Sequence, residues 1–367
     1  MASMFLVPGL IGVAASLAAA LLLVLTQRFH GHLSLDSHAG VQKLHLTPTP
    51  RIGGIALLVG AVTGGFWLPI EAQTLWWTLC LAAIPAFASG LAEDVTKRVG
   101  VKWRLLATIF AGFLFCELTG YRIASVDIPG ADWLLSFPLF SILFTAVAIG
   151  GIANAVNIID GVNGLASGTA IIVLSGFAVV AGQVGDVALL GCILLAISAL
   201  FGFFLMNFPV GRIFLGDAGA YSAGFVLAVI AVALPARNPD LSPLIGLLAL
   251  AYPVVETMVS IIRRMSREGT NPGQPDRLHL HSLVYRSRAR RLAQQLGVPH
   301  MRNPMTSLIL WSLSLLSSAL MVLSSHSSGL VLLGLAGVAA FYLVAYRRVA
   351  LLGPLFDRRS PEATSGA

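Results

Sequence analysis

Charged residues are scarce in this chain, since Asp, Glu, Lys and Arg make up only 11% of its 367 residues. A soluble domain carries roughly 25% charged residues, so the composition excludes an ordinary soluble protein. Cysteine is also rare, and Cys80, Cys116 and Cys192 all fall inside apolar runs. Their placement argues against a disulfide framework and against a cysteine-based metal site.

Long apolar runs are what the chain has instead. Hydrophobic residues make up 57% of the sequence, and about eleven runs are long enough to span a bilayer as helices of about 20 residues. We therefore predict an all-α polytopic membrane protein in which residues 1–367 form a single membrane domain. The first run lacks a cleavage site behind a short apolar core, so we expect it to be retained. The runs cover residues 5–27, 52–70, 74–90, 103–118, 134–153, 165–181, 187–207, 218–236, 243–262, 305–324 and 329–346.

The basic residues predict how the chain is oriented. If the runs alternate in direction, one face carries all of the 23 Lys and Arg except Arg122 and Arg237. By the positive-inside rule that face is cytoplasmic, with the N-terminus outside and the C-terminus inside. This topology accounts for the net charge of +7 and requires no nucleic acid partner.

Polar residues gather between two apolar runs in the motif NAVNIIDGVNGLASG, at residues 154–168. Asn154, Asn157 and Asp160 recur at every third position, so on a helix they share one face. Polar groups at membrane depth are costly unless they are paired, which makes these residues candidates for a functional site. The alternative is a polar turn between two membrane helices.

Adjacent acids, Glu93 and Asp94, end another apolar run in the motif GLAEDVTKR. Lys97 and Arg98 stand four residues beyond them, so two ordinary ion pairs on a helix end are the simpler interpretation. Crowding would raise the pKa of one carboxyl group unless the two share a cation, so the pair also suits a metal ion or a proton acceptor. The sequence leaves both interpretations open.

The segment KLHLTPTPRIGG precedes the second apolar run. Its prolines suit a rigid turn at a membrane interface. That interpretation does not explain why Lys43, His45 and Arg51 gather at its two ends. These three side chains could face an anionic ligand.

The motif FLGDAGA places Asp217 between glycines just before an apolar run. An Asp at this position is a common helix N-cap. The glycines also remove side chains where a phosphate could approach the helix N-terminus, and Arg212 adds a cation nearby. We therefore favour a functional role for Asp217.

The longest cytoplasmic segment covers residues 263–304. Residues 282–296 predict a short basic amphipathic helix, which suits lipid headgroups or a substrate phosphate. His279 and His281 alternate, so we expect both on an extended stretch that faces one pocket. Zinc is disfavoured, because no third ligand lies nearby. The tail, residues 350–367, is predicted to be disordered.

Together these motifs resemble the polyprenyl-phosphate N-acetylhexosamine-1-phosphate transferases, the family that contains phospho-MurNAc-pentapeptide translocase. The motifs HLTPTPRIGG, GLAEDVTKR, NAVNIIDGVNGLASG, FLGDAGA and DRLHLHSL occur in order between about residues 42 and 283. The resemblance implies transfer of an N-acetylhexosamine 1-phosphate from a UDP-sugar to undecaprenyl phosphate, with release of UMP. The product would initiate a cell-envelope glycan of the O-antigen or lipopolysaccharide type.

The resemblance also implies a setting and roles for single residues. It implies a bacterial inner membrane, an active site on the cytoplasmic face, Mg²⁺ with Mn²⁺ as a substitute, and a plausible homodimer. Asp94 and Asp217 match metal-binding positions, Glu93 is the candidate base or lipid-phosphate orienter, and Asp160 is a further catalytic candidate. The substrate-binding candidates are Lys43, His45, Arg51, Lys97, Asn154, Asn157, Asn163, Arg212, His279 and His281.

Three positions depart from the family pattern, and they imply an altered sugar specificity. Glu93 replaces an aspartate, Asn163 replaces an acid and Ser282 replaces a histidine. The main alternative function is a transporter or flippase for polyprenyl-linked precursors, which predicts charged residues inside the spans. The spans offer Glu117 and Glu256, both near span ends. An inactive scaffold for such precursors is a third hypothesis.

Overall fold

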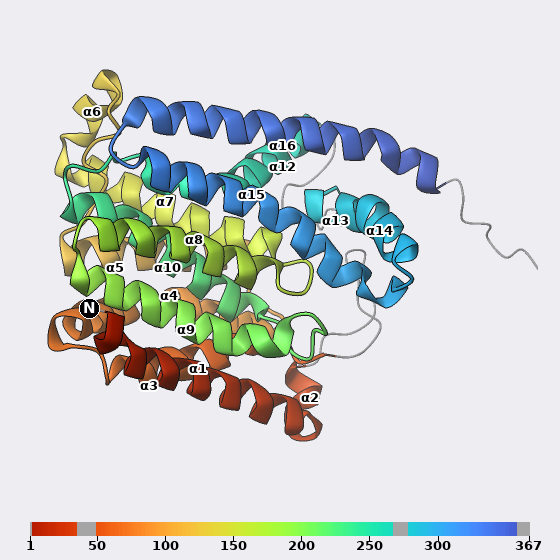
Figure 1. Cartoon of the computed structure of the whole chain (residues 1–367). Helices are drawn as coiled ribbons and strands as arrows, with labels where there is room; N and C mark the ends of the chain where they lie inside the picture. Colours follow the sequence, from red (N-terminus) through yellow and green to blue (C-terminus); the bar gives the residue numbers. More distant parts are fainter. Residues whose placement is uncertain (1, 35–48, 267–277, 358–367) are drawn as a thin grey trace, which may run out of the picture.

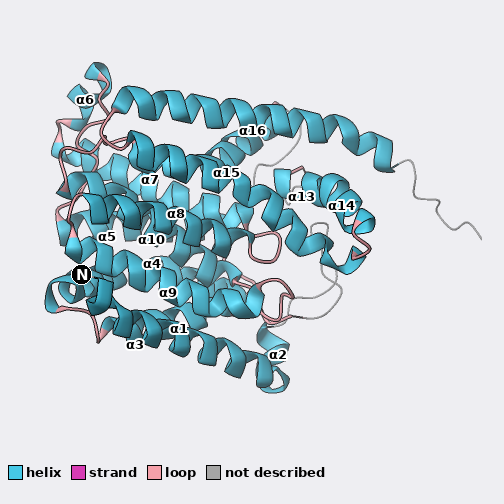
Figure 2. Cartoon of the chain, viewed as in Figure 1, coloured by secondary structure: helices cyan, strands magenta, loops and turns pink. Residues whose placement is uncertain are grey.

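The structure is a computed structural model that describes residues 2–34, 49–266 and 278–357. Every regular element in these ranges is helical, and the long helices pack side by side as one bundle (Figures 1 and 2). The helices are α1 (Ala2–Leu25), α2 (Gln27–Ser34), α3 (Gly53–Gly65), α4 (Ile70–Thr96), α5 (Val101–Thr119), α6 (Pro129–Leu135), α7 (Pro138–Ile159), α8 (Leu165–Gln183), α9 (Val187–Asn207), α10 (Gly216–Arg237), α11 (Ile245–Ala249), α12 (Ala251–Met265), α13 (Leu280–Val284), a π-helical turn (Tyr285–Ala289), α14 (Arg290–Gln295), a 3-10 turn (Pro299–Met301), α15 (Arg302–Ser324) and α16 (Ser328–Asp357).

Within the described ranges, 8 helices are long and apolar enough to cross a membrane. They are α1, α4, α7, α8, α9, α10, α15 and α16. The prediction of an all-α polytopic membrane protein is therefore confirmed, whereas the count of about eleven spans is not. Helix α3 has only 13 residues, and the run predicted at 243–262 divides at Leu250 into α11 and α12.

Helix α10 lies at the centre of the bundle. In its membrane window 83% of the residues are buried, against 17% in α16, so α10 is enclosed by protein while α16 faces outward. Helices α3, α4, α5, α7, α8 and α9 all contact it. A helix held from so many sides has little freedom to move, so its first turn provides a fixed position for a side chain.

Two glycines allow neighbouring helices to approach that first turn closely. A Cβ atom on Gly90 of α4 would lie 2.5 Å from the backbone nitrogen of Ala218. A Cβ atom on Gly54 of α3 would lie 2.5 Å from the backbone nitrogen of Gly219. Real Cβ atoms do not approach a backbone nitrogen so closely, so both positions require glycine.

The chain before α3 also pairs with the chain before α10. The N–H groups of Gly53 and Gly54 donate to the carbonyl oxygens of Phe214 and Leu215, both at 2.9 Å. The N–H of Phe214 donates in return to the carbonyl oxygen of Pro50 at 2.8 Å. These bonds join two motifs that lie far apart in the sequence and place Arg51 beside the start of α10.

One end of the bundle carries α2, α13 and α14, while α6 and the N-terminus lie at the other end (Figure 1). Helices α4 and α7 finish, and α5 and α10 begin, at the first of these ends, which we call the site end. The predicted cytoplasmic face corresponds to the site end. The side of the membrane that it faces stays a prediction.

The structure modifies two predictions about the C-terminal third. Residues 280–295 are helical throughout, in agreement with the helix predicted at 282–296. The extended stretch is wrong for His281, because α13 begins at Leu280; His279 alone is extended, with φ −64° and ψ 146°. Helix α16 continues to Asp357, past the predicted start of the tail at residue 350, and residues 358–367 lie outside the described ranges.

The contact at Gly90 can be tested by adding one methyl group. We expect Gly90→Ala to lower stability by about 1–3 kcal/mol, because the new Cβ meets backbone that must shift. The thermal midpoint of the detergent-purified protein should fall by several degrees. Gly151→Ala is the matched control, since a Cβ at that position of α7 has nothing within 4 Å. An equal midpoint for the two variants would contradict the close approach of α4 to α10.

Candidate active site

Asp217 lies in the first turn of α10 and is only 2% exposed. The chain enters the helix through Gly216, whose φ of +73° is a conformation that glycine favours. The N-cap residue, Leu215, has no side-chain cap of its own. The first N–H groups of a helix have no intrahelical acceptor, so those of α10 need one from elsewhere.

Asp94, near the end of α4, supplies that acceptor. Its Oδ1 accepts the N–H of Asp217 at 2.8 Å, and its Oδ2 accepts the N–H of Ala218 at 2.9 Å. The positive end of the helix dipole favours a carboxylate at this position. Helix α4 ends two residues later at Thr96, and Lys97 adopts a left-handed conformation with φ 55°. Asp94 therefore caps α10 across the bundle.

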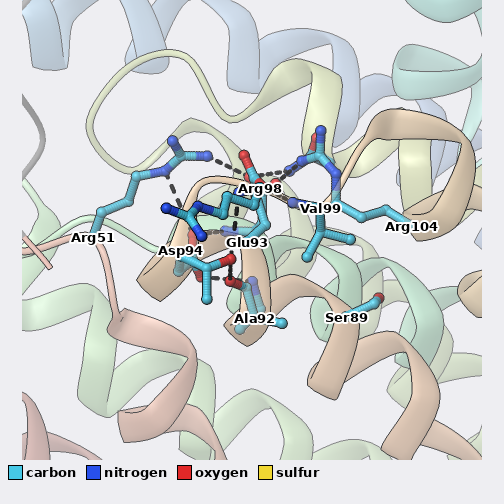
Figure 3. A network of polar contacts seen from close by, with 12 residues as sticks. Arg51, Ser89, Ala92, Glu93, Asp94, Arg98, Val99 and Arg104 are labelled. Atoms are coloured by element: carbon cyan, nitrogen blue, oxygen red, sulfur yellow. Dashed lines mark hydrogen bonds and ion pairs between the residues drawn. The ribbon is translucent and has the colours of Figure 1, made fainter. Parts of the chain in front are cut away.

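Two guanidinium groups pair with the Asp217 carboxylate. Nη2 of Arg51 donates to Oδ1 and Nη1 of Arg104 donates to Oδ2. Nε of Arg51 also lies 3.6 Å from Oδ1 of Asp94. Figure 3 shows the two arginines reaching inward from opposite sides, with Asp94 and Glu93 between them. The two guanidinium groups thus offset the charges of the Asp94 and Asp217 carboxylates.

Helix α7 contributes one of its three predicted polar residues to this cluster. Nδ2 of Asn157 donates to Oδ1 of Asp217 at 3.2 Å. Asp160 follows as the C-cap of α7. Asn154 instead donates to Oγ1 of Thr108 at 3.0 Å, so it links α7 to α5. Asn154 and Asn157, which were predicted to share one face, therefore serve different contacts: Asn157 faces the site and Asn154 faces α5.

Glu93 holds the turn between α4 and α5. Its Oε2 accepts the N–H of Val99 at 2.8 Å, just before α5 begins at Val101. Arg104 lies in the first turn of α5, so Glu93 helps to place that guanidinium. Its predicted role as a base stays a prediction.

Several predicted binding residues lie in other settings. Asn163 is 6% exposed, and its Nδ2 donates to the carbonyl oxygen of Pro209 at 3.1 Å. Lys97 and Arg212 are exposed on their turns. Lys43 and His45 lie outside the described residues.

The predicted histidine pair lies against the turn that follows α7. His279 and His281 are 5% and 6% exposed, and their rings stack with centroids 5.5 Å apart and planes 5° apart. A Cβ on Gly161 would lie 2.3 Å from Nε2 of His281, so this ring touches the residue after Asp160. The structure thus brings the histidine motif to the α7 side of the site.

Arg104 was not singled out by the sequence patterns. It stands at the border of an apolar run, where a basic residue is ordinary for a membrane helix. Its distance of ten residues from Asp94 gives no helical register, because a turn intervenes. Only the packing of α5 against α7 and α10 reveals that its guanidinium reaches Asp217.

The oxygen atoms of Asp94 and Asp217 are the candidate ligands for the Mg²⁺ that the motifs imply. The described residues contain no group of three or more His, Cys, Asp or Glu side chains that could hold a metal ion. Mg²⁺ is commonly bound by one or two carboxylates together with substrate phosphates and water. Asp217 fits such a site, since its oxygens meet only side-chain donors. Asp94 fits less well, because both of its oxygens accept backbone N–H groups.

The fold and this site define a polytopic membrane protein with a cluster of paired acidic and basic side chains at one end of its helices. The sequence model of glycosyl transferase family 4 matches residues 76–235, a range that includes Asp94, Arg104, Asn157, Asp160 and Asp217. The chain is 31% identical over 234 residues to the phospho-N-acetylmuramoyl-pentapeptide-transferase of Lactobacillus gasseri, covering 60% of this chain and 71% of that protein. The chain belongs to glycosyl transferase family 4, as its motifs predicted.

Two further relatives carry names of one reaction type. A probable undecaprenyl-phosphate N-acetylglucosaminyl 1-phosphate transferase of Bacillus subtilis is 29% identical over 241 residues, which are 65% of this chain and 66% of that protein. The undecaprenyl-phosphate alpha-N-acetylglucosaminyl 1-phosphate transferase of Yersinia pestis is 26% identical over 260 residues, 70% of each chain. The match thus spans slightly less than two thirds of the Bacillus protein.

The protonation of Asp160 gives a pH test of the site. Burial raises the pKa of its carboxyl group to about 7, against the opposing charge of Arg51. The unfolded chain has an Asp pKa of about 3.9, so the folded state binds the proton more tightly. Asp160 therefore lowers the free energy of unfolding as the pH rises from about 4 to about 7.

We expect the thermal midpoint in detergent to fall between pH 5 and pH 8 by several degrees more in the wild type than in Asp160→Asn. The amide of the variant cannot ionise, so this contribution is absent from it. Parallel midpoint curves for the two proteins would show that Asp160 ionises normally.

Proposed function

We propose that this chain transfers an N-acetylhexosamine 1-phosphate from a UDP-sugar to undecaprenyl phosphate and releases UMP. The observation that carries the proposal is the Asp217 carboxylate, fixed between two guanidinium groups at the first turn of the central helix. The names of the Bacillus and Yersinia relatives support the same acceptor and the same transferred group.

The location of the site suits a reaction between a lipid and a water-soluble compound. Asp217 lies at the site end, where the apolar helices stop. A polyprenyl chain would remain in the bilayer while its phosphate reached this level, and a UDP-sugar would approach from the water. A transporter would instead place its polar groups near the midplane of the membrane.

The guanidinium groups of Arg51 and Arg104 suit the diphosphate of a UDP-sugar. Arginine binds phosphate oxygens through paired N–H donors. Both guanidinium groups are already paired with Asp217, so a divalent cation would help to offset the two negative charges of a diphosphate. When bound, Mg²⁺ would be held by Asp217 and would offset the negative charge that develops on the leaving group.

The transfer itself requires little acid–base chemistry from the protein. An oxygen of the lipid phosphate forms a bond to the sugar-bearing phosphorus, and the bond from that phosphorus to the bridging oxygen breaks. UMP leaves with the electron pair. A phosphate monoester has a second pKa of about 6, so the nucleophile is mostly dianionic at neutral pH. The residues of the site mainly position and stabilise charge, as in other phosphoryl transfers.

We place the reaction at a bacterial inner membrane. The distribution of basic residues favours an orientation in which the site end and the C-terminus lie in the cytoplasm and the N-terminus lies outside. The product would initiate a cell-envelope glycan of the O-antigen or lipopolysaccharide type. Mn²⁺ as a substitute for Mg²⁺ and a homodimer remain part of the same proposal.

The reaction can be measured with purified protein in detergent, a panel of UDP-N-acetylhexosamines and undecaprenyl phosphate. We expect UMP release that requires both the lipid phosphate and Mg²⁺, and the preferred donor identifies the sugar. Absence of UMP with every donor, from protein with a cooperative thermal transition, would refute the proposed transfer.

Arg104→Ala tests whether the arginine found by the structure acts in the reaction. We expect kcat/KM for the UDP-sugar to fall about 100-fold, because a charge-assisted contact to phosphate is lost in a partly buried site. Lys102→Ala is the matched control, since Lys102 is exposed in the same turn of α5, and it should stay within about threefold of the wild type. Equal effects of the two variants on kcat/KM would show that Arg104 has no specific role in the reaction.

A further inference from the structure

Glu256 of α12 is a buried carboxylate to which the transfer described above assigns no role. It is 1% exposed, and its Oε1 lies 3.0 Å from Nδ1 of His279. The N–H of Leu280 donates to both carboxylate oxygens, at 3.3 and 3.2 Å. Oη of Tyr342, from α16, donates to Oε2 at 2.7 Å. One carboxylate thus binds donors from the histidine motif, the start of α13 and α16.

The same short segment is held on its carbonyl side. Nη1 of Arg263 donates to the carbonyl oxygen of Leu278 at 3.1 Å and to Oη of Tyr346 at 2.6 Å. Oη of Tyr346 donates to the Leu278 carbonyl at 3.1 Å. Residues 278–280 therefore lie in a clamp formed by Glu256 and Arg263 of α12 with Tyr342 and Tyr346 of α16.

The clamp determines how the first histidine presents its ring. An ionised carboxylate can only accept hydrogen bonds, so Nδ1 of His279 carries a hydrogen toward Glu256. The other ring nitrogen, Nε2, then remains for a different partner. A histidine fixed by a carboxylate in this way has a defined tautomer and orientation.

His279 contacts His281, and His281 in turn contacts the turn beside the site. The two rings stack nearly in parallel, and His281 touches Gly161, the residue after Asp160. Asn157, one turn earlier on α7, donates to Asp217. A short series of contacts therefore leads from Glu256 to the carboxylate at the start of α10.

We propose that Glu256 is a positioning residue, which holds His279 and through it His281 at the Asp160 turn so that the pair contacts the UDP-sugar. This inference rests on the proposed transferase function. Helices α13 and α14 extend beyond the bundle at the site end (Figure 1), so the histidines adjoin the aqueous side from which the soluble substrate comes. The lipid phosphate approaches from the membrane and does not depend on the clamp.

The test compares three variants in the UMP-release assay with the full chain. Glu256→Gln keeps the shape but removes the charge, and its single amide oxygen can accept from His279 or from Tyr342 but not from both. Glu256→Asp keeps the charge on a shorter side chain. Tyr346→Phe loosens the carbonyl side of the clamp without changing the group that faces His279, since Arg263 still donates to Leu278. Thermal midpoints establish that each variant is folded.

We expect Glu256→Gln to raise KM for the UDP-sugar about tenfold or more while KM for undecaprenyl phosphate stays unchanged. Glu256→Asp should recover part of this loss, and Tyr346→Phe should raise the same KM less than Glu256→Gln does, because the group that faces His279 is unchanged. A purely structural role predicts instead a lower kcat with both KM values unchanged, and equal losses for Glu256→Gln and Tyr346→Phe.

Two results would overturn the inference. Unchanged KM for the UDP-sugar in Glu256→Gln overturns the positioning role alone, provided that the wild type releases UMP. No UMP release by the wild type overturns the proposed function, and the positioning role with it.

Discussion

The two hydrogen bonds from the first turn of α10 to Asp94 are the contact on which the rest of the site depends. They join α4 and α10 at the point where both reach the end of the bundle. They also satisfy N–H groups that would otherwise be buried without acceptors, which costs about 1–3 kcal/mol per group. The glycines at positions 54, 90 and 216 follow from this contact, because a side chain at any of them would push the elements apart. The position of Asp217 is therefore a property of the packed bundle.

Charge balance is the second constraint. Asp217 and Asp94 are each 2% exposed, and an unpaired carboxylate would be strongly disfavoured in such a setting. Arg51 and Arg104 compensate them, and they approach from the segment before α3 and from α5, on opposite sides of the cluster. The same two guanidinium groups suit a diphosphate, so the groups that stabilise the free protein are also suited to bind the proposed substrate. Asn157 adds a neutral donor that orients Asp217 without changing the net charge.

Much of the fold and part of the site could be predicted from the sequence. Apolar runs predict helices because membrane depth leaves the backbone no other partner, and the acidic motifs predicted Asp94 and Asp217. The features that could not be predicted depend on how each helix is rotated about its axis and on which helices pack together. Asn154 and Asn157 look equivalent in the sequence, yet one faces α5 and the other α10. Arg104 and Glu256 each resemble an ordinary charge near the end of a span. Their partners lie 113 and 23 residues away, at Asp217 and His279, and no local pattern connects them.

The measurement that tests this account most directly is UMP release by Asp217→Asn. The amide keeps the shape of the side chain and leaves the backbone N–H groups bound to Asp94, so the variant should still fold, with a thermal midpoint lowered by the loss of the charge that pairs with Arg51 and Arg104. The loss of one negative charge removes the group that the account places at the centre of the reaction. We predict a loss of about 1,000-fold or more in kcat, comparable with the loss of a key electrostatic contact in other enzymes. A folded variant that retained activity within tenfold of the wild type would contradict the account.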